Sequence, residues 1–309
     1  MRVFRGTRDG VHSPIALTIG NFDGVHLGHQ AMLKRLREAA QRHGVSAAVL
    51  TFEPHPRELF TPDLAPARLT SIREKLELLC NQQIDQVHVV RFNRAFAAMT
   101  PQRFIDDLLI EQLKIRWLLV GDDFRFGAQR GGDFALLKQA ADRFGFALES
   151  MQSVEVAGER VSSTGVREAL ANADFQRATR LLGRPYRISG RVAHGKKLGR
   201  QLGFPTANIA LKRKCAPLNG IYAVKLHGIN STPLPAVASL GVRPTVMDDA
   251  AAVLEIHVLD FNDDIYGRHV SVEFLQKLRD EEKYPDLESL RQQIALDVEQ
   301  ARDYHHNHL

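Results

Sequence analysis

The sequence predicts a doubly wound α/β domain followed by a smaller β domain, and three observations support this prediction. In the first half, apolar segments of about five or six residues alternate with amphipathic segments, as in a parallel sheet covered by helices. After a short helix predicted at 173–183, the apolar period changes to two, which is typical of half-buried antiparallel strands. The 309 residues also exceed the ordinary size of one domain, about 100–200 residues. We therefore expect one domain at 1–183 and another at 184–309.

The first domain is expected to contain five strands and four helices in alternation. Within 30–43, Met32, Leu33 and Leu36 fall on one face of a helix, and the other helical segments show the same spacing. The predicted strands are 15–20, 45–52, 86–91, 115–120 and 146–150, and the predicted helices are 30–43, 71–81, 101–113 and 132–144.

The second domain is expected to be a small β-barrel. The preceding helix should stop at Gly183 and Pro185, because both residue types end helices. Apolar residues then alternate with other residues in four segments, and a short strand should follow the basic loop that begins at Gly195. The chain closes with an amphipathic helix near 287–303. The four alternating segments are 186–192, 222–226, 254–258 and 270–274.

Composition narrows the class of protein without naming a partner. With 44% hydrophobic and 25% charged residues, the chain resembles ordinary globular proteins rather than disordered or fibrous ones. No apolar run approaches the roughly 20 residues that cross a bilayer, and no signal peptide is evident, so we expect a cytoplasmic protein. Cys80 and Cys215 lack the spacing of a disulfide framework or a zinc site. The net charge of +5 suits nucleic acid, a membrane surface or nucleotide phosphates, but it is dispersed along the chain.

The most informative segment runs from Gly20 to His29, where the first predicted strand ends and the first helix begins. In open α/β sheets, ligands bind beyond the carboxyl ends of strands, and a helix N-terminus attracts phosphate. Glycines at 20, 24 and 28 permit close approach of the backbone to an anion. His26 and His29 are three residues apart, so both rings can face one triphosphate. The alternative interpretation is a pair of ordinary surface histidines beside a glycine turn.

This H-x-G-H segment resembles the HxGH nucleotidyltransferase superfamily, in which the motif binds the phosphates of ATP. The segments Thr51–Pro56, Val120–Gly127 and Ser162–Arg167 look like the adenylyltransferase half of the bifunctional bacterial riboflavin kinase/FAD synthetases. The resemblance implies a Rossmann-like N-terminal domain that joins FMN to the α-phosphorus of ATP, forming FAD and pyrophosphate.

The same resemblance implies roles for individual residues of the first domain. His26 and His29 would be catalytic, and Asp23, Phe52, Asp123 and Phe124 would contact the flavin. For these last four, the alternatives are turn caps for the aspartates and core packing for the phenylalanines. The implied ATP ligands are Gly20, Phe22, Gly24, His26, Gly28, His29, Ser162, Thr164 and Arg167.

A second candidate site lies in the alternating half, where a glycine-rich basic loop from Gly195 runs to Asn208. Its Pro-Thr-Ala-Asn sequence resembles the riboflavin kinase family, in which a Thr hydroxyl and an Asn side chain coordinate the Mg²⁺ of MgATP. The resemblance implies a six-stranded riboflavin-kinase β-barrel with a terminal helix, with Thr206 and Asn208 as metal ligands. Further segments follow in the family's order: Gly220–Val224, Gly241–Thr245, Leu254–His257 and Tyr266–Arg268.

Glu255 is the implied general base of the kinase. It alternates with Leu254 and Ile256, so its carboxylate should lie on the face opposite to those apolar side chains. It would accept the proton of the riboflavin 5′-hydroxyl, and the alternative is an exposed glutamate paired with a lysine. His257 and Glu273 are expected to be structural. The implied ATP ligands here are Gly195, Lys196, Gly199, Thr206 and Asn208, and Arg243 would contact flavin or nucleotide.

The sequence departs from the family pattern at two positions, and two other functions compete with the one that the resemblance implies. Ser239 stands where asparagine is expected, and Gly165 interrupts the Ser-Ser-Thr…Arg loop where a larger residue is usual. A class I aminoacyl-tRNA synthetase would share the H-x-G-H geometry, but no KMSKS-like segment is present. A barrel that binds nucleic acid would need stacking aromatics, and the chain has one Trp and five Tyr. The expected partners are riboflavin, FMN, ATP and Mg²⁺, without nucleic acid or membrane, in a monomer or weak homo-oligomer.

Overall fold

The computed structural model describes residues 1–7, 13–194, 199, 202–211, 215–242 and 252–308. The chain forms two compact units. The first contains Met1–Pro66 and Ile72–Ser162, and the second contains Ala67–Ser71 and Ser163–Leu309. Helices α7 (Ser163–Ala171) and α8 (Phe175–Leu182) therefore lie in the second unit. The domain boundary at 183/184, which was placed from the end of the predicted helix and the change to a two-residue period, stays a prediction.

A parallel sheet of six strands in the order β1-β4-β3-β2-β5-β6 organises the first unit. All five predicted strands are present. The sixth, β1, was not predicted because it has only four residues, lies at the edge and is largely exposed. The strands are β1 (Arg2–Arg5), β2 (Ile15–Ile19), β3 (Ser46–Glu53), β4 (Gln86–Arg91), β5 (Ile115–Gly121) and β6 (Ala147–Met151), and β7 (Glu155–Val156) pairs with β8 (Glu159–Arg160) in a separate two-stranded sheet.

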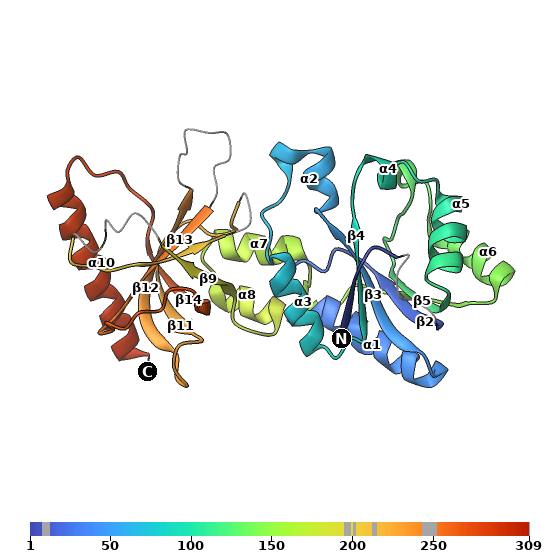
Figure 1. Cartoon of the computed structure of the whole chain (residues 1–309), viewed down its shortest axis with the longest axis horizontal. Coiled ribbons are helices and arrows are strands. Elements are labelled where there is room, and N and C mark those ends of the chain that lie inside the picture. The colour runs from blue at the N-terminus through green and yellow to red at the C-terminus, as the bar shows by residue number, and fades with distance from the viewer. Residues whose placement is uncertain (8–12, 195–198, 200–201, 212–214, 243–251, 309) are drawn as a thin grey trace. The chain divides into compact units, whose positions relative to one another are not determined.

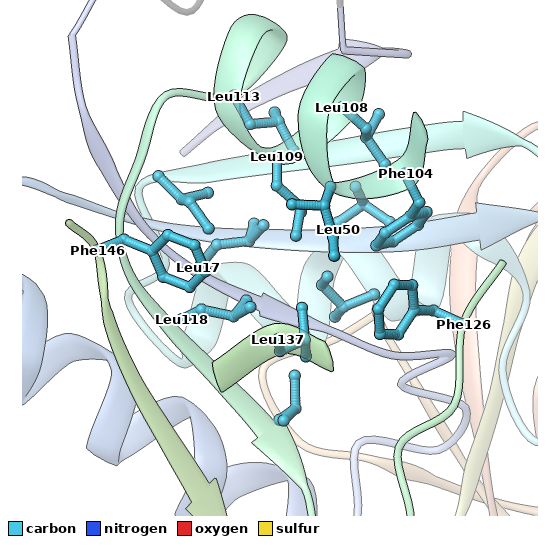
Figure 2. Packing of buried hydrophobic residues seen from close by; sticks show 14 of the residues in the cluster. Leu17, Leu50, Phe104, Leu108, Leu109, Leu113, Leu118, Phe126, Leu137 and Phe146 are labelled. Atoms are coloured by element: carbon cyan, nitrogen blue, oxygen red, sulfur yellow. The ribbon is translucent and has the colours of Figure 1, made fainter. Parts of the chain in front are cut away.

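Helices cover both faces of this sheet, which confirms the doubly wound prediction. Leucines of α1 (Leu27–His43) and α3 (Ile72–Asn81) share one buried cluster with Trp117 of β5. On the other face, the π-helix η2 (Phe104–Gln112) and α6 (Phe134–Phe144) pack onto Leu17, Leu50 and Leu118 (Figure 2). Shorter helices are α2 (Pro56–Phe60), η1 (Pro62–Leu64), α4 (Arg94–Ala97), α5 (Pro101–Arg103) and η3 (Ala128–Arg130).

The strand order determines where a ligand can bind. From β2 the chain moves outward to β3 and β4, and it then returns to the other side of β2 to form β5 and β6. The order of winding therefore reverses beside β2, and open sheets bind ligands at the carboxyl ends of strands at such a point. The loop that follows β2 carries residues 20–26, so the fold places the H-x-G-H segment at this position.

The second unit contains a closed antiparallel barrel in the order β10-β13-β12-β11-β14-β9, which confirms the predicted six-stranded barrel (Figure 1). One strand, β12, was not predicted, because its sequence LPAVASLGV gives a run of small apolar residues rather than a clear alternation. The strands are β9 (Arg187–Ala193), β10 (Ala207–Ala210), β11 (Gly220–His227), β12 (Leu234–Val242), β13 (Ala252–Val258) and β14 (His269–Arg279).

Apolar side chains fill the barrel, and a helix covers part of its outside. Tyr222 and Phe274 are buried, with their rings 5.3 Å apart and edge to face. The predicted terminal helix is α10 (Leu287–Asn307), and its residues Val298 and Ala301 pack against outward-facing Ile221 and other apolar residues of the barrel. Outward-facing positions of β11 and β12 near α10 are therefore sheltered from water.

Candidate active sites

The loop between β2 and α1 is held in a strained conformation by its own apolar residues. Phe22, Gly24 and Val25 have φ angles of 48°, 81° and 41°, in the left-handed region that disfavours side chains. The side chains of Phe22 and Val25 are almost completely buried, in the same cluster as Leu33 and Leu36 of α1. Burial of these side chains offsets the strain, so the loop has a fixed shape before any ligand arrives.

The two histidines of the motif lie face to face at the start of α1. His26 is the N-cap residue, and its Nδ1 accepts a hydrogen bond of 3.3 Å from the backbone N–H of His29. The ring centroids are 3.7 Å apart, with 18° between the ring planes. The expectation that both rings face the same side is confirmed. Because Nδ1 of His26 is an acceptor, the neutral ring carries its proton on Nε2, where it can serve as a donor.

His29 is neutral at physiological pH in the absence of ligand. Its burial, and then the neighbouring His26 and Lys75, hold the pKa of the ring well below the ordinary histidine value of 6.5. Nδ1 of His29 is buried without a hydrogen-bond partner in the described residues, and the Phe22 ring lies 4.9 Å from the His29 ring. The His29 ring therefore offers a hydrogen-bond donor and little positive charge of its own.

Aromatic rings lie so close to Gly20 and Gly28 that a larger residue at either position would crowd them. A Cβ on Gly28 would lie 3.2 Å from Cε1 and Nδ1 of His26 and 3.6 Å from the carbonyl oxygen of Val161. A Cβ on Gly20 would lie 3.1 Å from the Phe22 ring. The contact with Val161 also places the residues immediately before Ser162 at the N-terminus of α1. The predicted phosphate ligand Ser162 directly follows Val161 in the chain.

The residues predicted to contact flavin in the first unit have mixed environments. Phe52 and Phe124 are half-buried and pack against the core cluster of Figure 2. The Phe52 ring lies 5.6 Å from that of Phe92, and the Phe124 ring is stacked 5.7 Å from Phe126. Asp23 is buried, whereas the carboxylate of Asp123 is exposed and lies 3.7 Å from a guanidinium nitrogen of Arg160.

Thr164 and Arg167 lie on α7 in the second unit. Arg167 Nε donates a hydrogen bond of 2.6 Å to the carbonyl oxygen of Ala67, and Thr164 is exposed. Gly165 is buried inside the first turn of α7, so the expected loop is a helix. The prediction of a loop at this segment is wrong, because Ser163 begins a nine-residue helix.

A buried lysine near the motif was not predicted. Lys75 of α3 is only 5% exposed, and its Nζ lies 3.5 Å from Oγ1 of Thr51 at the end of β3. Thr51 Oγ1 in turn donates a hydrogen bond of 3.2 Å to the backbone carbonyl of Asn21. From the sequence, Lys75 was one polar residue of an amphipathic helix, and its burial depends on packing between distant elements.

In the barrel, three polar side chains form a row across neighbouring strands. Glu255 of β13 lies opposite Asn208 of β10 and, on its other side, opposite Ser239 of β12. Directly opposed residues of antiparallel strands project to the same face. Leu254 and Ile256, on either side of Glu255, are completely buried inside the barrel. The predicted outward orientation of Glu255 is therefore confirmed.

Glu255 and Thr206 line two different pockets of the second unit. A pocket of about 590 Å³ is bounded by Glu255 and Ser239 on the strands, by Arg279 and Tyr284, and by α10. A second pocket of about 310 Å³ is bounded by Thr206 and the segment 261–266. His257 Nδ1 lies 2.9 Å from the carbonyl oxygen of Pro205, next to Thr206. The two pockets therefore open on neighbouring parts of one strand pair.

The described part of the basic loop reaches Thr206. The backbone N–H of Phe204 donates a hydrogen bond of 2.7 Å to the carbonyl oxygen of Gly199, and a Cβ on Gly199 would lie 3.1 Å from Thr206 Oγ1. Gly199 also lines the larger pocket. The predicted ligands Gly195, Lys196 and Arg243 fall outside the described residues.

The two residues expected to be structural, His257 and Glu273, make hydrogen bonds or ion pairs within the barrel. His257 bonds the Pro205 carbonyl, as above, and Glu273 accepts hydrogen bonds from Arg187 and lies 3.0 Å from His227 Nε2. Ser239, the departure from the family's asparagine, donates a hydrogen bond of 3.3 Å to Glu281. The serine hydroxyl thus has a partner at the rim of the larger pocket.

The candidate metal ligands are hard oxygen donors. Among the described residues, no group of three or more His, Cys, Asp or Glu side chains gathers as a metal cage. Thr206 and Asn208 supply a hydroxyl and an amide oxygen, which fits Mg²⁺, because this ion keeps several waters and is commonly shared with substrate phosphates.

Over the residues that the structure describes, no helix has the length and apolar character needed to span a membrane.

Comparison with known proteins agrees with both halves of this description. A family model described as FAD synthetase matches residues 9–165, and one described as riboflavin kinase matches residues 182–305. A protein of Escherichia coli strain K12 named bifunctional riboflavin kinase/FMN adenylyltransferase is 48% identical over 307 residues, covering 98% of each chain. Its namesake in Pseudomonas fluorescens is 51% identical over 291 residues, covering 94% of this chain and 93% of that one.

A solved structure resembles the whole chain. It is described as a macrolide-efflux protein from Streptococcus pneumoniae, and it matches with a TM-score of 0.75 and 28% identity over 98% of each chain. The riboflavin kinase match covers the barrel, which favours a catalytic barrel over one that binds nucleic acid. The FAD synthetase match in the first half and the riboflavin kinase match in the second half also favour an enzyme with two activities over an aminoacyl-tRNA synthetase. The chain belongs to the family of bifunctional riboflavin kinase/FMN adenylyltransferases, with the adenylyltransferase part first.

Proposed function

We propose that the His26–His29 pair serves the adenylylation of FMN to FAD, and that the Asn208–Glu255 pair serves the phosphorylation of riboflavin to FMN. Both reactions consume ATP. The observation that carries this assignment is the presence of two separate polar sites, each within one compact unit. One is a stacked histidine pair at a helix N-terminus, and the other is a carboxylate opposite an amide on the outside of a barrel.

In the first reaction, a phosphate oxygen of FMN attacks the α-phosphorus of ATP. The bond from that phosphorus to the bridging oxygen breaks, and pyrophosphate leaves. His26 and His29 donate N–H bonds to the triphosphate, and the backbone of the loop from Gly20 through Gly28 approaches it closely. Chemistry of this kind depends mainly on positioning and on stabilising charge, which suits a pre-formed loop. Ser162, Thr164 and Arg167 stay predicted phosphate ligands.

In the second reaction, the 5′-hydroxyl oxygen of riboflavin attacks the γ-phosphorus of ATP, and ADP leaves. The Glu255 carboxylate accepts the hydroxyl proton. Thr206 and Asn208 would hold Mg²⁺, which when bound would neutralise charge on the ATP phosphates. The register supports this assignment, because Asn208 lies directly opposite Glu255. The larger pocket, which Glu255 lines together with Tyr284, suits the apolar ring system of a flavin.

The remaining assignments are finer proposals. Phe52 and Phe124 would flank the flavin ring in the first unit, with Asp23 and Asp123 contacting polar groups of the nucleotides or Mg²⁺. Gly195, Lys196 and Gly199 would wrap the ATP phosphates of the kinase, and Arg243 would contact flavin or nucleotide. A monomer or weak homo-oligomer in the cytoplasm, without nucleic acid or membrane partners, stays the prediction.

A paired substitution tests the assignment within one chain. With FMN, ATP and Mg²⁺, His29→Ala should lower FAD formation by about 10²–10³-fold, the usual effect of removing one pre-organised donor. Riboflavin phosphorylation should continue at the wild-type rate. Glu255→Ala should have the opposite pattern, and chelation of Mg²⁺ should stop FMN formation. Chromatographic separation of riboflavin, FMN and FAD measures both reactions. Equal loss of both activities in His29→Ala would contradict two separate sites.

A further inference from the structure

Lys75 occupies a position that is unfavourable for a cation. It lies in the first turn of α3, where the helix dipole repels positive charge, and it is only 5% exposed. Burying an ammonium group carries a large desolvation cost unless the surroundings are polar. Its neighbour Glu74 is also buried, at 7% exposure. A buried ionisable side chain beside a candidate site is itself a candidate for a role in that site.

Hydrogen bonds connect Lys75 to the H-x-G-H loop. Its ammonium group donates to Thr51 Oγ1 at 3.5 Å, and the Thr51 hydroxyl donates to the Asn21 carbonyl at 3.2 Å. Asn21 directly precedes Phe22, whose ring packs in the same buried cluster as Leu79 of α3. The carboxyl end of β3, the motif loop and the start of α3 are therefore joined by both polar and apolar contacts.

The His29 ring contributes little positive charge to the adenylylation site. Burial and the proximity of His26 favour the neutral form of His29, and the field of Lys75 reaches the same ring and acts in the same direction. The ionisable residues known to act on His29 are thus His26 from the loop and Lys75 from α3, while Asp23 is buried in the loop itself. A triphosphate brings several negative charges, which neutral N–H donors cannot balance.

We propose that the Lys75 ammonium supplies positive charge to the adenylylation site and is held at the motif loop through Thr51. This inference rests on the proposed role of His26 and His29. Lys75 acts as a positioning residue, because it fixes the Asn21 carbonyl through Thr51. Its field adds to the effects of burial and of His26, which together favour the uncharged form of His29. The burial that makes the lysine unfavourable also strengthens its field, because the local dielectric is low.

Three variants of the full chain separate charge from structure. Lys75→Met removes the charge with little change in volume, Lys75→Arg keeps the charge, and Thr51→Val removes the hydroxyl that links Lys75 to the loop. FAD formation from FMN and ATP is measured against pH, and riboflavin phosphorylation by the same chain is the control for folding. NMR titration of the His29 ring, assigned by comparison with His29→Ala, gives the pKa of that histidine directly.

We expect Lys75→Met to lower kcat/KM for FAD formation about 10²-fold, with riboflavin phosphorylation unchanged and the His29 pKa moved up towards 6.5. Lys75→Arg should keep the low His29 pKa and recover most of the rate. Thr51→Val should keep the low pKa and lose part of the rate. Fluorescence of Trp117, buried in the same unit, reports whether each variant folds.

The proposal is overturned if Lys75→Met forms FAD at a rate within threefold of wild type. It is also overturned if Lys75→Met and Lys75→Arg lose the same activity while the His29 pKa stays fixed, because that pattern means a purely structural lysine. If Lys75→Met does not fold, Lys75→Arg and Thr51→Val decide the question through the His29 pKa and the rate. A wild-type chain that forms no FAD would instead contradict the proposed function.

Discussion

Substitution of Gly28 by alanine tests whether the placement of His26 controls adenylylation. Gly28 lies inside α1, one residue past its start, and an added Cβ would lie 3.2 Å from two atoms of the His26 ring. That separation is shorter than ordinary van der Waals contact, so the ring has to move by a few tenths of an ångström. The ring cannot move far without disturbing its stack with His29, which lies 3.7 Å away.

The expected loss of rate follows from this displacement. A misplacement of about 1 Å in a catalytic group costs roughly 10²-fold, so a few tenths of an ångström should cost about three- to tenfold in kcat for FAD formation. Stability should move the other way, because alanine in a helix is favoured over glycine by about 0.5–1 kcal/mol. The phosphorylation of riboflavin takes place in the other unit and should be unchanged.

Gly44 supplies a matched control at the opposite end of the same helix. Its φ angle of 65° is left-handed, and no atom lies within 4 Å of an added Cβ. Gly44→Ala should therefore lose about 1 kcal/mol of stability from backbone strain and leave the rate of FAD formation intact. Both variants are measured by chromatographic assay and by denaturant unfolding followed through Trp117 fluorescence. A Gly28→Ala enzyme with full FAD synthesis would refute the reasoning.

Two further predictions concern stability. Asp297 accepts two hydrogen bonds of 2.7 Å from Arg279, whose side chain is 19% exposed, so Asp297→Ala should cost about 2–3 kcal/mol in the second unit. Circular dichroism during urea unfolding measures the free energy of unfolding. If Asp297→Ala loses no more of this free energy than Asp297→Ala/Arg279→Met, the unpaired Arg279 carries no cost and the prediction is wrong. Acid should destabilise the first unit: His29 and His88 both have folded pKa values below the unfolded 6.5, so stability is complete above that pH and falls below it. Melting followed by Trp117 fluorescence from pH 8 to 5 tests this, and a melting temperature that rises on acidification would be the opposite result.

Local patterns in the sequence predicted the parts of each site that depend on short chain separations. His26 and His29 lie within one turn, so their spacing and the strand-to-helix junction were sufficient to predict that the rings face the same side. The outward orientation of Glu255 followed from the two-residue period of a strand. The edge strand β1 was not predicted, because its four residues show no alternation between buried and exposed positions.

Features that depend on contacts between distant elements were not predicted. Lys75 is 24 residues from Thr51 in the chain, and only the packing of α3 shows that it is buried and linked to the motif loop. The separation of Thr206 and Glu255 into two pockets likewise depends on the register of β10 against β13. A helical or strand period contains no information about such pairings, because it describes one element at a time.

Alternate residues of β13 face opposite sides of the barrel wall and therefore contribute to different properties of the protein. Leu254 and Ile256 point inward and contribute to the stability of the barrel, whereas Glu255 between them lies on the outward face, where we propose that riboflavin binds. Evolution can therefore repack the interior with side chains of similar volume while turnover stays constant, and it can retune the reacting face without weakening the barrel.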